Sequence, residues 1–180
     1  MPSLLKLFRK DPVKARAATL YLALLERARE PSLYGDEGAP DTVDGRFDLI
    51  VLHAALVMRH LRGEGEEGQR LAQALFARLF DDMDAALREM GIGDLSVGKK
   101  IKAMAEAFYG RAAAYDTALK SGDGDALKDA IWRNLFDSAP ERESAASRLA
   151  DYAMVADARL AGTPLDAFQA GRLPVLQGAG

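Results

Sequence analysis

The chain has 180 residues, no cysteine and a formal net charge of −3, with 28% charged and 49% hydrophobic residues. This length suits one domain with a substantial core. The lack of cysteine excludes disulfides, thiolate metal sites and cysteine nucleophiles, and the mildly acidic balance lacks the basic footprint of a nucleic-acid binder.

The first 20 residues form a basic segment, with five lysines and arginines against Asp11. Leu4, Leu5, Leu7 and Phe8 stand beside Lys6, Arg9 and Lys10, a pattern typical of a short anchor on an anionic membrane. Packing of Leu4 and Phe8 onto the domain explains the pattern equally well. We expect no signal peptide, because the segment has no long apolar region. The longest apolar run, residues 49–58, has about half the length that spans a bilayer.

Apolar residues recur at helical spacing along the chain, and no strand alternation competes with them. Asp11 is an N-cap before Pro12, Pro31 marks a stop, and residues 31–46 are rich in proline and glycine, so they predict a loop. The predicted helices cover about residues 12–30, 47–62, 67–90, 97–121, 124–137 and 140–161, with a short last turn at 163–171. The central one is 47–62, which is apolar almost all round.

These elements predict an all-α fold, a single domain of six to seven helices around one core. We expect three parts along the chain. Residues 1–32 form the basic segment and first helix, residues 33–160 the core of the domain, and residues 161–180 a C-terminal turn and loose tail.

The stretch "GIGDLSVGKK", residues 91–100, comes close to a phosphate-binding loop. That motif follows a buried strand and needs Ser or Thr after its lysine to bind magnesium. Here a helix precedes the stretch, and Lys100 stands at the Ser/Thr position. We therefore predict a helix junction in which Gly91 and Gly93 end one helix and Ser96 caps the next. No nucleotide, metal or other cofactor is expected.

Three lysines, Lys99, Lys100 and Lys102, lie at the start of the next predicted helix. Positive charge near a helix N-terminus opposes the macrodipole, by about 0.3 to 1 kcal/mol per residue. Their position is unfavourable for folding, which favours a role in partner contact.

The acidic cluster Asp81, Asp82 and Asp84 has two interpretations, a solvated face or an acidic contact surface. A metal site is disfavoured, because only Asp81 and Asp84 share a helical face. Further on, Tyr109 and Arg111 point away from the core stripe that holds Phe108. Gly110 costs about 1 kcal/mol in mid-helix relative to alanine, which indicates close approach by either an internal neighbour or a partner.

The two histidines, His53 and His60, lie two turns apart on the most apolar helix. We predict that they are hydrogen-bonded core or boundary residues, since no second ligand cluster accompanies them. No nucleophile–base set is recognisable either, so the sequence favours a binding protein over an enzyme.

Three stretches, "FDLIVLHAALVMRHLR", "LFDDMDAALREMGIGDLSVGKKIKAMAEAFYGR" and "AYDTAL", closely resemble the ubiquinol–cytochrome c chaperone family. The resemblance extends over about residues 33–155 and is most specific at 79–111. It implies an assembly factor for the cytochrome bc1 complex (respiratory complex III). In mitochondria such proteins bind newly made cytochrome b at the ribosome and inner membrane, together with a small partner protein.

The chain resembles a bacterial member, since it has no evident presequence and is close to the bare domain. That implies a cytoplasmic location, with a peripheral position at the inner membrane as an alternative. Two other functions stay open: a membrane-surface or ribosome-binding adaptor without a cytochrome b client, and a helical metalloenzyme. The candidate partner contacts are Lys99, Lys100, Lys102, Asp81, Asp82, Asp84, Tyr109 and Arg111.

Overall fold

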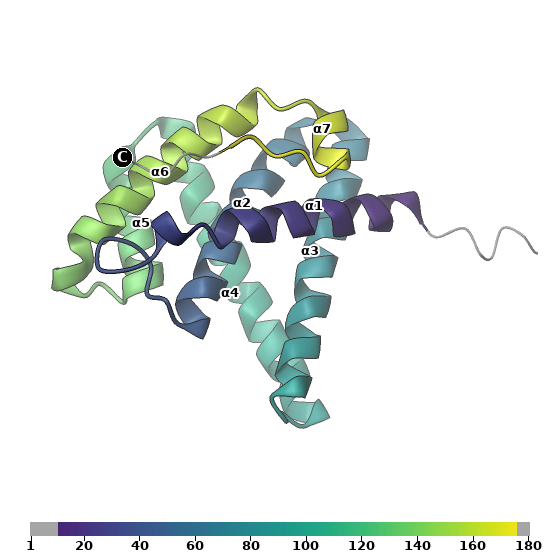
Figure 1. The fold of residues 1–180 in the computed structure, drawn as a ribbon, viewed down its shortest axis with the longest axis horizontal. Coiled ribbons are helices and arrows are strands. Elements are labelled where there is room, and N and C mark those ends of the chain that lie inside the picture. The colour runs from purple at the N-terminus through teal and green to yellow at the C-terminus, as the bar shows by residue number, and fades with distance from the viewer. Residues whose placement is uncertain (1–10, 176–180) are drawn as a thin grey trace, which may run out of the picture.

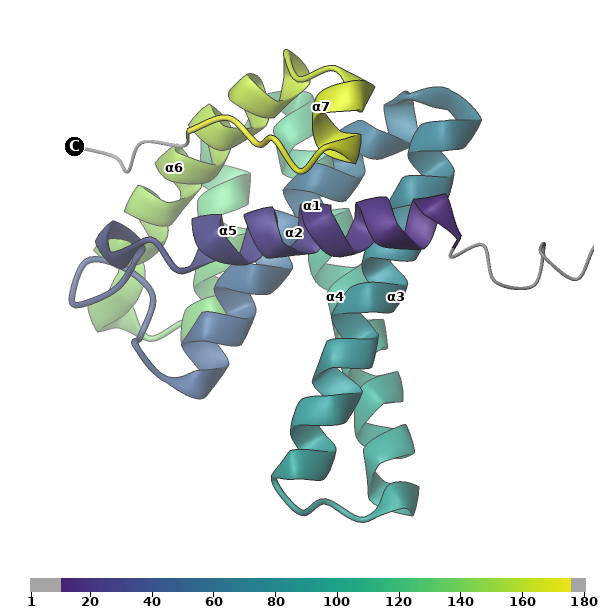
Figure 2. The ribbon, with the colours of Figure 1, turned by 45° about the vertical axis from the view of Figure 1, so that its right-hand side comes forward.

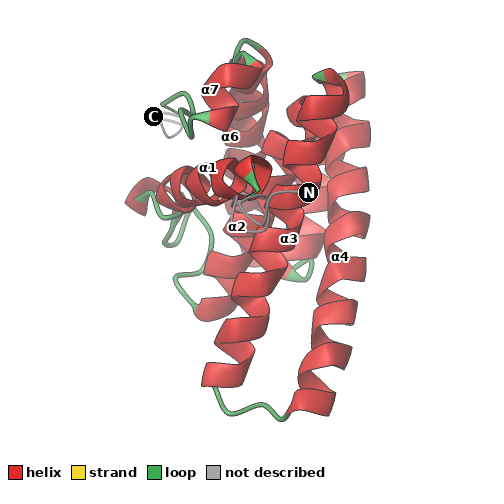
Figure 3. Ribbon diagram, turned by 90° about the vertical axis from the view of Figure 1, so that its right-hand side faces the viewer, coloured by secondary structure: helices red, strands yellow, loops and turns green. Residues whose placement is uncertain are grey.

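A computed structural model describes residues 11–175, and this part of the chain contains seven α-helices, two 3-10 turns and no β-strand (Figures 1 and 3). The helices are α1 (Pro12–Ala28), α2 (Val43–Gly63), α3 (Gly65–Glu89), α4 (Asp94–Ser121), α5 (Gly124–Phe136), α6 (Glu143–Ala161) and α7 (Leu165–Gln169), and the 3-10 turns are Pro31–Leu33 and Pro140–Arg142. The predicted all-α domain is confirmed. Residues 4–10, for which a membrane anchor and packing onto the domain were equally good explanations, lie outside the described range.

α2 is the centre of the fold, as its composition predicts. Leu49, Leu52 and Leu56 are fully buried, and the helix packs against α1, α3, α4 and α6. One continuous hydrophobic cluster joins α2 to these helices and to α5 and α7. Nothing in residues 11–175 is both long enough and apolar enough for a membrane-spanning helix.

The N-terminus of α2 lies earlier than predicted, so the predicted loop is wrong over residues 43–46. Thr42 caps the helix by accepting a hydrogen bond from the Gly45 amide at 3.1 Å. Gly45 fits because the chain approaches it closely: a Cβ there would lie 2.1 Å from the carbonyl oxygen of Pro40. The glycine suggests a loop in the sequence but serves a close contact inside a helix.

α1 crosses α3 and covers one side of the bundle (Figure 1). The predicted N-cap is confirmed, since Asp11 accepts a hydrogen bond from the Val13 amide at 3.0 Å. The buried face of α1 includes Leu20, Tyr21 and Leu24.

At the other end of the chain, α5 and α6 pack side by side, and α7 returns to contact α1. α7 begins after Pro164, and the preceding Thr163 does not cap it, because the Thr163 hydroxyl donates back to the carbonyl of Arg159.

The outer ends of α3 and α4 project from the body as a two-helix hairpin (Figure 2). We call residues 83–104 the arm. Gly91 ends α3 with φ of 80°, a left-handed conformation that favours glycine. Gly93, not Ser96, is the N-cap of α4, so the predicted Ser96 cap is wrong. Segment 91–100 thus joins two helices, as predicted.

Candidate interaction surface

The three predicted contact lysines are all exposed on the arm. Because α4 begins at Asp94, Lys99 is its sixth residue and Lys102 its ninth. The macrodipole acts mainly within the first turn, so the predicted unfavourable position does not hold. Lys102 lies 3.9 Å from Glu106. Within residues 11–175, neither Lys99 nor Lys100 forms an ion pair, and none of the three pairs with Asp81, Asp82 or Asp84.

The three aspartates do not form one acidic surface. Asp82 accepts a hydrogen bond from the Tyr21 hydroxyl at 2.9 Å and pairs with Arg78 at 3.2 Å. Burial raises the pKa of Tyr21 well above its usual value, and the bond to Asp82 adds to this effect. Asp82 thus joins α1 to α3. A contact role for Asp82 would have to break these interactions.

Asp84 has a structural role in the arm. It pairs with Arg88, whose guanidinium also bonds Asp94 across the turn between α3 and α4. This three-residue group joins the two helices near the tip. Beside it, two large apolar side chains are exposed: Met90 (62%) and Leu95 (89%).

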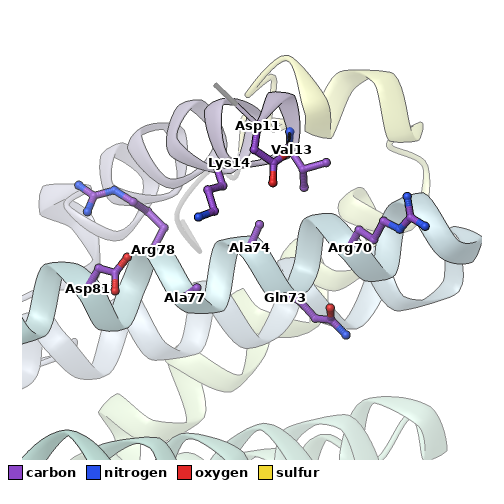
Figure 4. Close-up of a pocket in the computed structure, with 9 residues that line it drawn as sticks. All are labelled: Asp11, Val13, Lys14, Arg70, Gln73, Ala74, Ala77, Arg78 and Asp81. Carbon is purple, nitrogen blue, oxygen red and sulfur yellow. Dashed lines mark hydrogen bonds between the residues drawn. The ribbon is translucent and has the colours of Figure 1, made fainter. Parts of the chain in front are cut away.

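Asp81 is exposed and lines an open cleft between α1 and α3 of about 550 Å³ (Figure 4). The other lining residues are Asp11, Val13, Lys14, Arg70, Gln73, Ala74, Ala77 and Arg78. Lys14 extends from α1 toward α3 over a floor of small side chains (Figure 4). The rim mixes both signs of charge, so it selects no simple anion or cation.

Tyr109 lies on the side of α4 that faces α3. Its ring is 53% exposed and stacks on Phe76, with centroids 5.0 Å apart. Phe76 in turn meets the buried Phe108 edge to face. The two rings border an open groove of about 430 Å³, which we call the Tyr109 groove. It is lined by Met58, Arg62, Gln69, Ala72, Gln73, Phe76 and Tyr109.

Helical spacing groups Phe76 with the core-facing residues of its helix, which is why the sequence did not predict this groove. Its spacing matches the buried positions, but Phe76 lies at the border of the hydrophobic cluster and its side chain is half-buried. The sequence does contain one signal for the groove: Tyr109 directly follows the core residue Phe108, so its ring cannot share the buried face of the helix.

Gly110 follows Tyr109, and its surroundings contradict one expectation. A Cβ at Gly110 would meet no atom within 4 Å in the described chain. Internal close approach is therefore not the reason for this glycine.

Arg111 binds Asp48 of α2, in an ion pair that is largely buried. Burial raises the pKa of Asp48, against the opposing effect of the guanidinium. Arg111 therefore holds α4 to α2, and its side chain is engaged inside the fold. Its predicted role in partner contact gains no support from this position.

Both histidines are hydrogen-bonded inside the fold, as predicted. His53 Nδ1 lies 2.7 Å from the carbonyl of Leu49, and Nε2 lies 2.7 Å from the Tyr152 hydroxyl. A carbonyl only accepts, so Nδ1 donates and Nε2 accepts. His60 Nε2 donates to Asp157 at 2.7 Å, and Arg59 links Asp157 to Asp116. Among residues 11–175, no group of three or more acidic or histidine side chains could hold a metal ion.

The arrangement therefore offers binding surfaces: a projecting arm with lysines and exposed apolar side chains, an aromatic groove at its base and a cleft beside α1.

Comparison with known proteins gives these surfaces a context. The family model described as ubiquinol-cytochrome C chaperone matches residues 36–176. The crystal structure of the Cbp3 homolog from Brucella abortus is similar with a TM-score of 0.81 and 33% sequence identity, covering 95% of each chain.

More distant relatives are named ubiquinol–cytochrome c reductase complex assembly factor 1. The Xenopus laevis protein is 26% identical over 129 residues, the mouse protein 23% over 145 and the human protein 24% over 129. These alignments cover 72, 81 and 72% of this chain. They cover 64, 49 and 43% of the relatives, so the chain spans roughly half the length of these proteins.

Proposed function

This chain belongs to the ubiquinol–cytochrome c chaperone family, and on that premise we propose that it is an assembly chaperone that binds newly made cytochrome b and supports biogenesis of the cytochrome bc1 complex. The observation that carries the proposal is the family match over residues 36–176. It is supported by the likeness of the whole fold to a Cbp3 homolog. The relatives are named as assembly factors, which supports a binding role over a catalytic one.

The surface suits a client that is rich in apolar helices. Such a client needs apolar contact while its own partners are missing, and charged contacts for its loops. The Tyr109 groove supplies two aromatic rings together with Met58, whose flexible side chain adapts to varied shapes. The arm supplies exposed Leu95 and Met90 together with the lysines.

The proposed location is the cytoplasm, with peripheral contact at the cytoplasmic face of the inner membrane, where such a client is inserted. Contact with the ribosome or with a small partner protein belongs to the same proposal. An adaptor that binds membranes or ribosomes without cytochrome b is the competing function. No feature of the described surface favours it over the chaperone.

A deletion strain tests the proposed function. We expect loss of ubiquinol–cytochrome c reductase activity and a lowered membrane level of cytochrome b, both restored by the plasmid-borne gene. Affinity purification of the tagged protein from the complemented strain should recover cytochrome b. Normal activity and normal cytochrome b in the deletion strain would contradict the proposal. Recovery of ribosomes or lipid without cytochrome b would favour the adaptor.

A further inference from the structure

The Tyr109 groove has an aromatic wall that the described part of the chain leaves partly exposed. Met58 and Ala72 are buried at its base, and the Phe76 and Tyr109 rings form one wall. The opening is large enough for a large apolar side chain of another molecule. Arg62 and two glutamines form the polar rim.

The groove lies in line with part of the lysine cluster. Residues of a helix turn by about 100° each and rise about 1.5 Å. Lys102 therefore lies about two turns, or ~10 Å, from Tyr109 on nearly the same face of α4. Lys99 lies about three turns away, within roughly 80° of Tyr109. Lys100 points about 180° away from Tyr109 and belongs to another side of the helix.

The net charge on the surface that joins the Tyr109 groove to Lys99 and Lys102 favours an acidic partner. Arg62 at the rim and Lys99 on the arm have no ion-pair partner within residues 11–175, and Lys102 has one long contact to Glu106. Glu106, between Lys102 and Tyr109, is the opposing charge on this face. Two of the three cations are thus free for an anionic group.

Gly110 leaves the surface of α4 open beside the Tyr109 groove. It lies on nearly the same face as Lys99, about three turns along, and no described atom occupies the position of its missing side chain. An exposed glycine in mid-helix is unfavourable for folding, and here it leaves room for a second helix to lie against α4.

We propose that the Tyr109 groove binds one amphipathic helix of the client. An apolar side chain of that helix enters the groove, and acidic residues two to three turns away pair with Lys99 and Lys102. The helix crosses α4 over Gly110. This inference rests on the proposed function for the identity of the client, while the chemistry of the bound helix is argued from the surface alone.

Synthetic peptides test the inference with the full-length protein. The probe is a fluorescein-labelled helix of about 18 residues with leucine and alanine on one face, a central phenylalanine and three glutamates two to three turns from it. The matched peptide carries lysines in place of the glutamates. By fluorescence anisotropy, the glutamate peptide should bind about tenfold more tightly at low salt.

Matched variants assign the contacts. The double variant Lys99→Gln/Lys102→Gln should reduce the preference for the glutamate peptide over the lysine peptide to about twofold or less. Lys100→Gln should leave this preference unchanged. Gly110→Leu and Tyr109→Ala should each weaken binding of the glutamate peptide about tenfold, whereas Gly110→Ala should change it less than about twofold. Gly110→Leu should melt at or above the wild-type temperature, because leucine favours helix and meets no neighbour.

Equal binding of the two peptides, no binding of either, or equal effects of Lys100→Gln and the double variant would overturn the inference. The genetic test remains separate. If the deletion strain fails to assemble the complex but Gly110→Leu and Tyr109→Ala both restore it fully, the inference falls and the proposed function stands. If the deletion strain assembles the complex normally, the proposed function falls whatever the peptides do.

Discussion

His53 is a polar side chain that is only 2% exposed, and the fold satisfies both of its ring nitrogens. The carbonyl of Leu49 and the hydroxyl of Tyr152 together fix the neutral tautomer. Protonation would make Nε2 a donor facing a hydroxyl that donates to it in the neutral form, at a buried position. Burial accordingly lowers the pKa of His53 to about 4.

This pKa predicts a pH dependence of stability. An unfolded histidine has a pKa near 6.5, so between about pH 6.5 and 4 the unfolded state binds a proton that the folded state excludes. The contribution of neutral His53 is complete above pH 6.5 and is lost as the pH falls toward 4. We expect the free energy of unfolding to drop by roughly 3 kcal/mol over this window, measured by urea titration at several pH values.

The variant His53→Gln is the control, because it keeps a buried amide that can hydrogen-bond but removes the titrating ring. Its stability should vary less with pH across the same window. The lowered carboxyl pKa values of Asp116 and Asp157 act at lower pH and are common to both proteins. Parallel pH profiles for the two proteins would show that His53 does not carry the effect.

At the scale of elements, α4 shows what helical periodicity can and cannot predict. The stripe of Val97, Ile101, Met104 and Phe108 predicted the buried face, and each of these residues is buried or half-buried. The start of the helix was misplaced by three residues, because Ser96 is a good N-cap by composition but lies inside the first turn. That shift places the lysines beyond the reach of the helix N-terminus.

The shifted start gives a sharper expectation for the lysines. Lys99→Gln, Lys100→Gln and Lys102→Gln together should leave the melting temperature nearly unchanged, since the dipole effect has faded and the Lys102–Glu106 pair is exposed. If the lysines serve the client, the triple variant should recover less cytochrome b in affinity purification. A folded triple variant with full recovery would place the client contact elsewhere, and an unfolded one would make the lysines structural.

At the scale of the whole molecule, the all-α class and the helices were predictable, but the pairing of distant residues was not. Asp48 and Arg111 are 63 positions apart, and nothing in either helix marks them as partners. Tyr109 and Phe76 likewise meet only because α3 and α4 run antiparallel as a hairpin. Periodicity identifies which face of a helix is buried, while the neighbour across that face depends on crossing angles that a single sequence does not reveal. The Tyr109 groove, at the junction of three helices, is therefore a property of the assembled fold.

The arm also has a consequence for how the molecule opens. Val97 is fully buried near the tip, yet it does not belong to the continuous hydrophobic cluster of the body. The tip is thus held by the packing around Val97 and by the Arg88 ion pairs, and it can separate without disrupting α2. Amide protons at residues 85–100 should then exchange with solvent through partial unfolding, at a free energy at least ~2 kcal/mol below that of global unfolding. Hydrogen–deuterium exchange followed by mass spectrometry would show fast exchange there and slow exchange in residues 49–58, and equal rates in both segments would mean that the arm and the body unfold as one cooperative unit.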